Sequence, residues 1–192
     1  MADPSHARAD RPATANAPAL DRHGALPASH AVPDLLTPGL RLVFCGTALG
    51  RVSALRRAYY ANPTNKFWRT LHAVGLTPTR FAPQDYPKLL PLGIGLTDLA
   101  KAHYGNDAEL PEGALDAAAL TQRIAQVAPR MLAFTSKTAA SAWLGRPTGR
   151  IAYGPQVERI GPTAIWVLPS PSGSASRYWD AAPWQALARE IG

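Results

Sequence analysis

Short runs composed almost entirely of apolar residues recur along this chain. They lack the alternation of apolar and polar residues expected of a strand with one solvent-exposed face, so they are typical of strands in a parallel sheet that is buried on both faces. A glycine-containing run at residues 93–99 also fits a strand. The three clearest apolar runs are residues 40–45, 131–134 and 164–168.

Amphipathic stretches fill the intervals between these runs. Residues 51–58 fit a short helix or an ordered loop, and four prolines limit residues 78–91 to at most one helical turn. Residues 145–161 fit one exposed strand or turn. Strands that alternate with helices predict an α/β fold whose parallel sheet is covered on both faces. Apolar residues recur at helical spacing in residues 64–74, 115–127, 136–144 and 180–191. Ser136 suits the cap of the third of these helices.

The N-terminal part of the chain has a different composition. Residues 1–38 are rich in alanine and proline and show no apolar period, so they cannot bury enough surface to offset the entropy of ordering. We therefore expect a flexible extension at residues 1–38 and one domain at residues 39–192. The single cysteine, Cys45, favours a cytoplasmic setting, and no stretch has the apolar length needed to span a bilayer.

The charge is concentrated in the expected domain. The chain carries +7 at neutral pH with a pI near 10.0. Residues 1–38 contribute −1, which leaves +8 on residues 39–192. An excess of this size on a folded domain favours a polyanionic partner such as nucleic acid.

A glycine-bracketed stretch follows the first apolar run. Gly46 and Gly50 enclose Thr47, Ala48 and Leu49. Small residues at the carboxyl end of a parallel strand leave backbone N–H groups free to face a ligand, although a plain strand-to-helix turn has the same composition. The stretch lacks the lysine of a nucleotide-triphosphate loop, and no paired cysteine or histidine spacing suits zinc, so neither a metal nor a cofactor is expected.

Three stretches in order resemble the mismatch-specific uracil/thymine DNA glycosylases of the uracil-DNA glycosylase superfamily. The first motif is GTALG at residues 46–50 with YANPTNKFW at residues 60–68, the middle segment is GIGLTDL at residues 93–99, and the second motif is WVLPSPSG at residues 166–173. This resemblance implies a three-layer α/β/α sandwich with a central, mostly parallel sheet. It also implies an enzyme that flips a base out of DNA into a pocket.

The resemblance assigns a base pocket to the first motif. Tyr60 occupies the position of the aromatic ring that stacks on the flipped base, and backbone groups near Thr47 and Tyr60 would meet the uracil oxygens. The relatives have Gly-Ile-Asn-Pro-Gly here, with an asparagine that orients the attacking water, whereas this chain has Ala48. Asp98 is the first candidate to replace it, either by accepting a proton from water or by accepting the uracil N3–H. Asn62 is the second candidate.

The second motif and its neighbours are the candidate DNA contacts. Ser170 is placed by the resemblance at the edge of the active site, as a third candidate catalytic residue. Arg51 follows the first motif and suits a phosphate contact. The remaining candidates correspond to the segment that approaches phosphate and fills the gap left by the flipped nucleotide: Ser172, Gly173, Ser174, Ala175 and Arg177.

These observations predict a monomeric, monofunctional uracil-DNA glycosylase that hydrolyses the N-glycosidic bond and leaves an abasic site, as in base excision repair. The expected partner is uracil-containing DNA, single- or double-stranded, with no membrane association. Ala48 motivates one alternative, a protein that binds uracil or abasic DNA without efficient turnover. A second alternative is an α/β domain that binds a free nucleotide or another small anion at the Gly46 loop.

Overall fold

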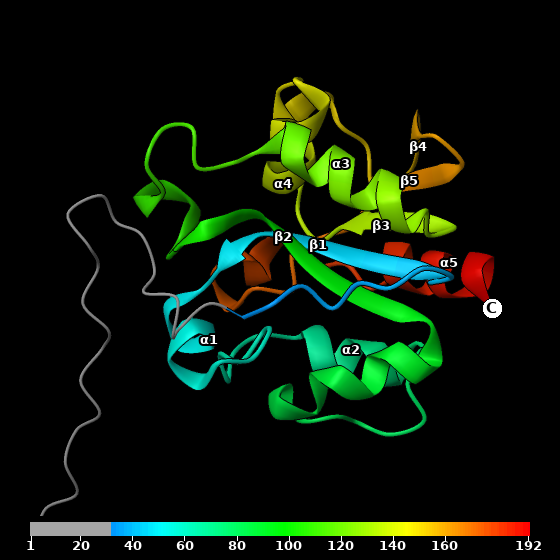
Figure 1. Ribbon diagram of the computed structural model, residues 1–192. Coiled ribbons are helices and arrows are strands. Elements are labelled where there is room, and N and C mark those ends of the chain that lie inside the picture. The colour runs from blue at the N-terminus through cyan, green and yellow to red at the C-terminus, as the bar shows by residue number, and fades with distance from the viewer. Residues whose placement is uncertain (1–31) are drawn as a thin grey trace, which may run out of the picture.

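A five-stranded sheet forms the centre of the protein (Figure 1). The computed structural model describes residues 32–192. The strand order is β2-β1-β3-β5-β4, in which β1 is parallel to both β2 and β3, β3 is parallel to β5, and β4 is antiparallel to β5. The strands are β1 (Leu42–Leu49), β2 (Ile94–Tyr104), β3 (Met131–Phe134), β4 (Gly154–Ile160) and β5 (Thr163–Val167).

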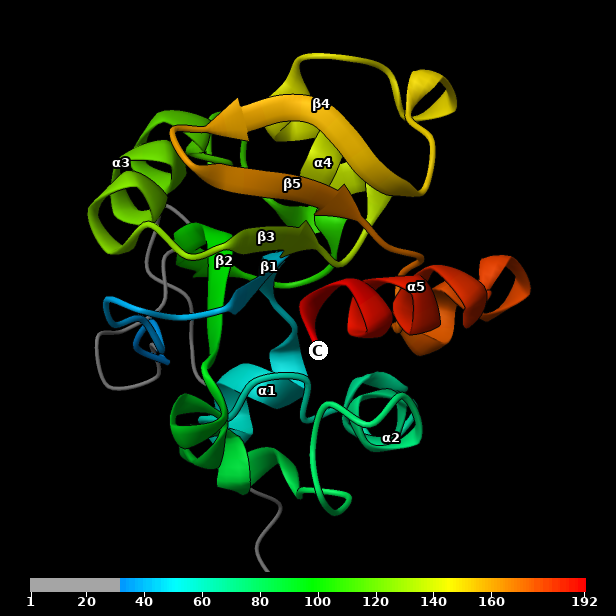
Figure 2. The ribbon, with the colours of Figure 1, turned by 90° about the vertical axis from the view of Figure 1, so that its right-hand side faces the viewer.

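Helices cover both faces of this sheet (Figure 2). The helices α3 (Ala117–Val127) and α4 (Lys137–Leu144) lie on one face. The other face is covered by α2 (Phe67–Ala73), α5 (Ala182–Ile191) and the 3₁₀ helix η2 (Pro83–Leu92). The remaining short elements are α1 (Arg51–Arg56), η3 (Asp107–Glu109), η4 (Thr148–Arg150) and η5 (Gly173–Tyr178).

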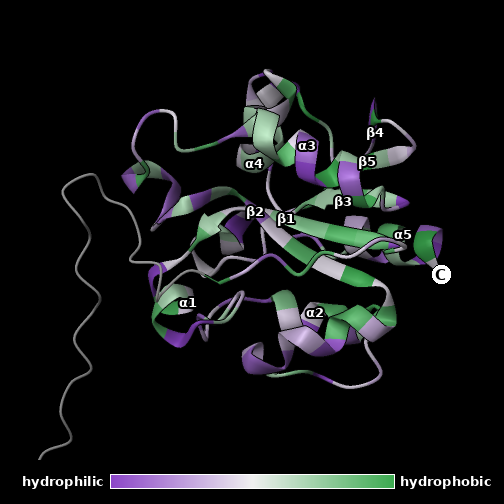
Figure 3. Ribbon diagram, in the orientation of Figure 1, coloured by the Kyte–Doolittle hydropathy of each residue, from purple (hydrophilic) through white to green (hydrophobic). Residues whose placement is uncertain are grey.

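The predicted three-layer α/β/α sandwich with a mostly parallel sheet is confirmed. Two separate apolar cores hold the layers together. Phe44 of β1 stacks on Trp184 of α5 with ring centroids 5.5 Å apart in one core. Val43, the preceding residue of β1, faces the opposite way and packs with α3 and α4 in the other core. Because successive strand residues point to opposite faces, a strand between two helical layers must be apolar throughout, and β1 is mostly green in Figure 3.

Two predicted boundaries are wrong. β1 does not end at Gly46 but continues through the glycine-bracketed stretch to Leu49, because Gly46 and Ala48 pair with Asp98 and Ala100 of a long β2. The connection at residues 78–91 contains a 3₁₀ helix of ten residues rather than at most one turn. Pro83 begins this helix, and the Asp85 carboxylate accepts a hydrogen bond from the Ala82 N–H at 3.0 Å.

The predicted extension is too long at its C-terminal end, because residues 32–38 pack on the domain. Leu35 forms an antiparallel bridge with Leu96, with reciprocal N–H···O distances of 2.9 and 3.1 Å. Val32 and Leu35 are buried in the core that contains α2 and α5. A side chain on Gly95 would clash with the Leu35 carbonyl, so this glycine permits the approach. The rest of the predicted extension, residues 1–31, lies outside the described residues.

None of the helices in residues 32–192 is both long and apolar enough to cross a bilayer.

Candidate active site

A cavity of about 630 Å³ opens at the carboxyl edge of the parallel strands. Its volume falls within the range typical of small-molecule sites. Its walls come from four distant parts of the chain: β1 with α1, the turn at residues 59–65, β2 with the loop after it, and the segments that follow β3 and β5. Among the predicted site residues, those that line it are Thr47, Ala48, Arg51, Tyr60, Asn62, Asp98, Ser170, Ser172, Ser174 and Ala175.

Asp98 lies at the floor of this cavity. Its side chain is only 3% exposed, and Gly46 is its partner in the register of β1 and β2. A Cβ on Gly46 would overlap Asp98 Oδ1, so the missing side chain at position 46 makes room for the carboxyl group. Asp98 Oδ2 is buried and has no hydrogen-bond partner within the described part of the chain. An orphan carboxylate oxygen beside a cavity is free to accept a hydrogen bond from a bound molecule.

Burial raises the pKa of Asp98 to about 7. The nearby charge of Asp34 also raises it, whereas Lys101, Arg123 and the Gly46 N–H lower it. Desolvation of the charged form is the largest of these effects. The carboxyl group is therefore divided between its acid and its base form near neutral pH, which is the range in which general acid–base catalysis is most effective.

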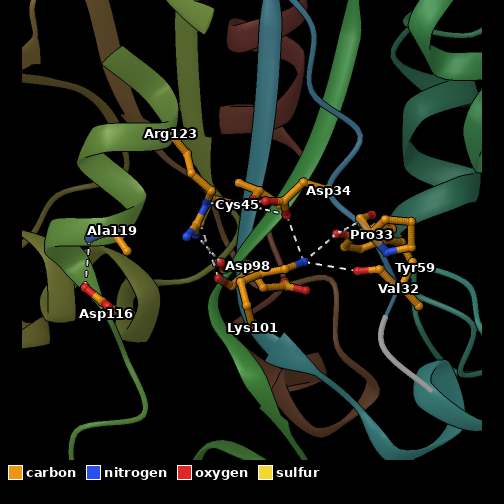
Figure 4. A network of polar contacts seen from close by, with 12 residues as sticks. Val32, Pro33, Asp34, Cys45, Tyr59, Asp98, Lys101, Asp116, Ala119 and Arg123 are labelled. Carbon is orange, nitrogen blue, oxygen red and sulfur yellow. Dashed lines mark hydrogen bonds and ion pairs between the residues drawn. The ribbon is translucent and has the colours of Figure 1, made fainter. Parts of the chain in front are cut away.

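A network of ion pairs lies next to Asp98 (Figure 4). Asp34, from the segment before β1, binds Lys101 Nζ at 2.8 Å and Arg123 Nε at 3.3 Å. Asp34 also accepts a hydrogen bond from Thr97 Oγ1 at 2.8 Å. Arg123 Nη2 in turn donates to the Asp98 backbone carbonyl at 2.9 Å. One acidic side chain thus holds two cations beside the strand that presents Asp98.

Tyr60 forms one wall of the cavity in a strained backbone conformation. Its φ of 53° lies in the left-handed region, which is uncommon for a bulky residue. The ring stacks on Phe67 with centroids 3.8 Å apart, and the hydroxyl lies 3.3 Å from Thr135 Oγ1. Tyr59, the preceding residue, is buried in the core. The contacts with Phe67 and Thr135 thus hold Tyr60 in this strained conformation, in which it faces the cavity.

Ala48 and Thr47 line the cavity from within β1 rather than from a loop. The Ala48 methyl group can neither donate nor accept a hydrogen bond. Any polar group that positions a water molecule in this cavity must therefore come from another residue.

Asn62 is less suited to that task than the sequence predicts. Its Oδ1 accepts hydrogen bonds from the Thr64 N–H at 3.0 Å and from Thr64 Oγ1 at 2.9 Å. Both lone pairs of the amide oxygen are therefore in use, and only the amide N–H groups are left to face a ligand. Asn62 can donate to an oxygen in the cavity, but it cannot accept a proton from water.

The serine-rich turn packs against the first motif. Ser170 Oγ accepts from the Ser172 N–H at 3.3 Å, and the hydroxyls of Ser172 and Ser174 lie 2.9 Å apart. Gly173 is not among the residues that line the cavity, and a side chain there would overlap Thr64. Its small size therefore permits this packing contact.

The two predicted basic contacts differ in placement. Arg51 lines the cavity, but its guanidinium forms an exposed ion pair with Glu109 at 3.0 Å. A phosphate must compete with this carboxylate, although an exposed pair is weak enough to exchange. Arg177 does not line the cavity, and its guanidinium lies 4.5 Å from the centroid of the Tyr178 ring.

Several residues of the site are absent from the sequence prediction. Thr135 and Ser136 follow β3 and line the cavity, and Ser136 was predicted only as the cap of α4, where its Oγ accepts from the Ala139 N–H at 3.0 Å. The rule that parallel strands end at one edge would have included them. Lys66 is buried and donates to Ser176 Oγ, which ties the first motif to the second. The other unpredicted lining residues include Asn65, Thr138 and residues 105–107.

In residues 32–192 no group of three or more His, Cys, Asp or Glu side chains is arranged to hold a metal ion.

Comparison with known proteins supports the resemblance seen in the motifs. The solution NMR structure of a "putative uracil DNA glycosylase" from Methanosarcina acetivorans is similar over 85% of this chain and 98% of its own, with a TM-score of 0.54 and 24% sequence identity. This likeness shows a shared fold. The pattern of the Uracil DNA glycosylase superfamily matches residues 33–189, which is most of the chain. With its motifs gathered around one cavity, the protein belongs to the uracil DNA glycosylase superfamily.

Proposed function

We propose that this protein is a monofunctional uracil-DNA glycosylase in which Asp98 takes the place of the missing asparagine. The observation that supports this most directly is the buried Asp98 carboxyl group at the floor of the cavity, with one oxygen unpartnered and a pKa of about 7. Membership of the superfamily supports the class of reaction, and the substrate and the residue roles are our inference.

The cavity suits an extruded pyrimidine. Phe67 covers one face of the Tyr60 ring, which leaves the opposite face for a flat base. Stacking of this kind contributes about 1–3 kcal/mol per base. The N–H groups of Asn62 and the hydroxyl of Thr47 supply donors toward the base oxygens. This combination favours uracil, which is planar and has two carbonyl oxygens.

The reaction that we infer is a hydrolysis at C1′. A water molecule held by Asp98 forms a bond to C1′, while the electron pair of the N1–C1′ bond leaves with the base. The proton lost by the water passes to the Asp98 carboxylate. Donors around the base stabilise the departing anion, so the carboxylate needs to provide only part of the barrier reduction. An alternative role for Asp98, accepting the uracil N3–H, requires the same ionised form.

The geometry favours Asp98 over Asn62 as the group that activates water. The Asn62 amide oxygen already accepts two hydrogen bonds, whereas Asp98 Oδ2 accepts none. No lysine is found among the described residues that line the cavity. The cavity thus offers no amine to form a Schiff base, which supports hydrolysis without strand cleavage.

A single-turnover experiment tests this proposal. Excess full-length protein is mixed with an oligonucleotide containing one uracil, and abasic sites are revealed by alkali. We expect cleavage only after alkali, and a rate that rises with pH to a plateau above about pH 7 as Asp98 ionises. Asp98→Asn should lower the rate by roughly 10²- to 10⁴-fold, the range typical of general acid–base catalysis, while DNA affinity changes little. Asp107→Asn, at an exposed aspartate of the same cavity, serves as the matched control and should leave the rate unchanged.

Ala48 favours one second candidate, a protein that binds uracil or abasic DNA without turnover. The same experiment decides between the two. Retarded mobility of the uracil oligonucleotide with no alkali-labile product over hours would reject the enzyme and support the binding protein.

A further inference from the structure

Two exposed aromatic rings next to the cavity are each paired with a cation. Lys137 Nζ lies 4.5 Å from the centroid of the Tyr153 ring, and Arg177 Cζ lies 4.5 Å from the centroid of the Tyr178 ring. Tyr153 is 36% exposed and Tyr178 is 61% exposed. A tyrosine ring in solvent beside a positive charge offers a flat apolar face next to a cation.

The first pair lies next to residues that line the cavity. Lys137 begins α4 between Ser136 and Thr138, which both line the cavity. Tyr153 immediately precedes Gly154, the residue of β4 that pairs with Val167 at the end of β5. Figure 2 shows the start of β4 next to the end of β5, at the edge of the sheet from which the chain continues to the second motif.

The second pair lies on the same side. Arg177 and Tyr178 end η5, two and three residues after Ala175, which lines the cavity. The helix α5, which begins four residues after Tyr178, contacts β4, and Asp180 lies close enough to Tyr153 to raise the pKa of its hydroxyl together with burial. The Asp180 carboxylate accepts from the Ala182 N–H at 2.9 Å.

We infer that the Lys137–Tyr153 and Arg177–Tyr178 pairs form a stacking surface for unpaired nucleotides that flank the flipped base on the same DNA strand. This inference rests on the proposed function, because the strand enters the cavity beside the pairs. The favoured substrate is then single-stranded DNA, or DNA with a locally unpaired segment.

The chemistry of the pairs fits a single strand better than a duplex. A tyrosine ring in solvent stacks on any base, whatever its sequence, but only when that base is not already stacked and paired within a helix. The lysine and arginine side chains are long enough to leave their rings and contact the phosphates between the stacked bases. The excess positive charge of residues 39–192 agrees with such a partner.

Binding of DNA that contains no uracil tests this inference apart from catalysis. Fluorescence anisotropy of the full-length protein is measured with a labelled single strand and with the duplex of the same sequence, both free of uracil. We expect Tyr153→Ala and Tyr178→Ala each to weaken single-strand binding by about 5- to 100-fold, and duplex binding by less than about 2-fold. Phenylalanine at either position should preserve single-strand binding. Val157→Ala, at a site 90% exposed on β4, is the matched control.

The two cations are tested through a different quantity, the salt dependence of single-strand binding. Lys137→Gln and Arg177→Gln should each reduce the salt dependence of single-strand binding by about one phosphate contact. Single-strand affinity unchanged in both tyrosine variants, or an equal loss with the duplex, would overturn the inference. Failure of the proposed function appears differently, as an absence of alkali-labile product from uracil DNA with intact, tyrosine-dependent binding to uracil-free strands.

Discussion

The buried carboxyl group of Asp98 should make the stability of the fold depend on pH in a way that Asp98→Asn removes. Asp98 has a pKa of about 7 in the folded protein, against an ordinary value of 3.8 for an exposed aspartate. Between these two values the unfolded chain ionises while the folded protein keeps its proton. The unfolded state is therefore favoured progressively as pH rises from about 4 to about 7.

The size of the effect follows from the same two values. Each pH unit between them corresponds to about 1.4 kcal/mol, so the whole interval amounts to about 4 kcal/mol. Between pH 4.5 and pH 8.0, the contribution of Asp98 to the free energy of unfolding should fall by about 3 kcal/mol. Asparagine has the same shape and no charge, so its variant should lack this decrease.

Urea unfolding of both proteins at pH 4.5 and pH 8.0 provides the measurement. Comparing the change with pH, rather than stability at one pH, removes any constant cost of the amide substitution. The free energy of unfolding should fall between the two pH values by about 3 kcal/mol less in Asp98→Asn than in the wild type. An equal fall in both proteins would mean that Asp98 ionises normally when folded, and the acid–base role would lose its physical basis.

Three further substitutions test other contacts. Tyr60→Ala should weaken binding of a uracil oligonucleotide and slow excision, because the ring is the proposed stacking surface, whereas Tyr60→Phe should lose only the hydroxyl contact to Thr135; anisotropy and single-turnover rates measure both. Asp34→Asn removes the acidic partner of two cations, so urea or thermal unfolding should show a free energy of unfolding lower by about 2 kcal/mol. Because Asp34 raises the pKa of Asp98, the midpoint of the rate–pH profile should also move to lower pH in this variant. Gly173→Ala should destabilise the protein by about 1–3 kcal/mol through overlap with Thr64, whereas Gly149→Ala, which meets no atom within 4 Å, should leave the urea midpoint unchanged; equal midpoints would refute the packing role.

Local patterns predict much of the fold but little of the detailed geometry. β3 has the predicted bounds because a four-residue apolar run depends on nothing distant. The Ser136 cap could likewise be predicted from neighbouring residues. The continuation of β1 past Gly46 could not be predicted in this way, because it depends on pairing with β2, about fifty residues away. The same limit applied to Leu35, whose partner Leu96 lies on another strand.

The candidate site was also predictable only in part. Resemblance to a family placed Thr47, Tyr60 and Asp98 on segments that line one cavity. It could not show that the Asn62 oxygen is saturated by Thr64, because an amide's hydrogen bonds depend on the backbone turn around it. Nor could it show the pKa of Asp98, since that value results mainly from burial.

The short segment before β1 has a consequence for how this protein is handled as a recombinant domain. Composition alone suggests a domain that begins at residue 39. A chain truncated there would lose Leu35 and expose the backbone of β2, the outermost parallel strand. Exposed strand edges recruit other chains, so such a truncation should self-associate and precipitate. It would also leave Lys101 and Arg123 without their shared counterion beside Asp98. The first seven described residues therefore cover a strand edge and balance two partly buried cations at once.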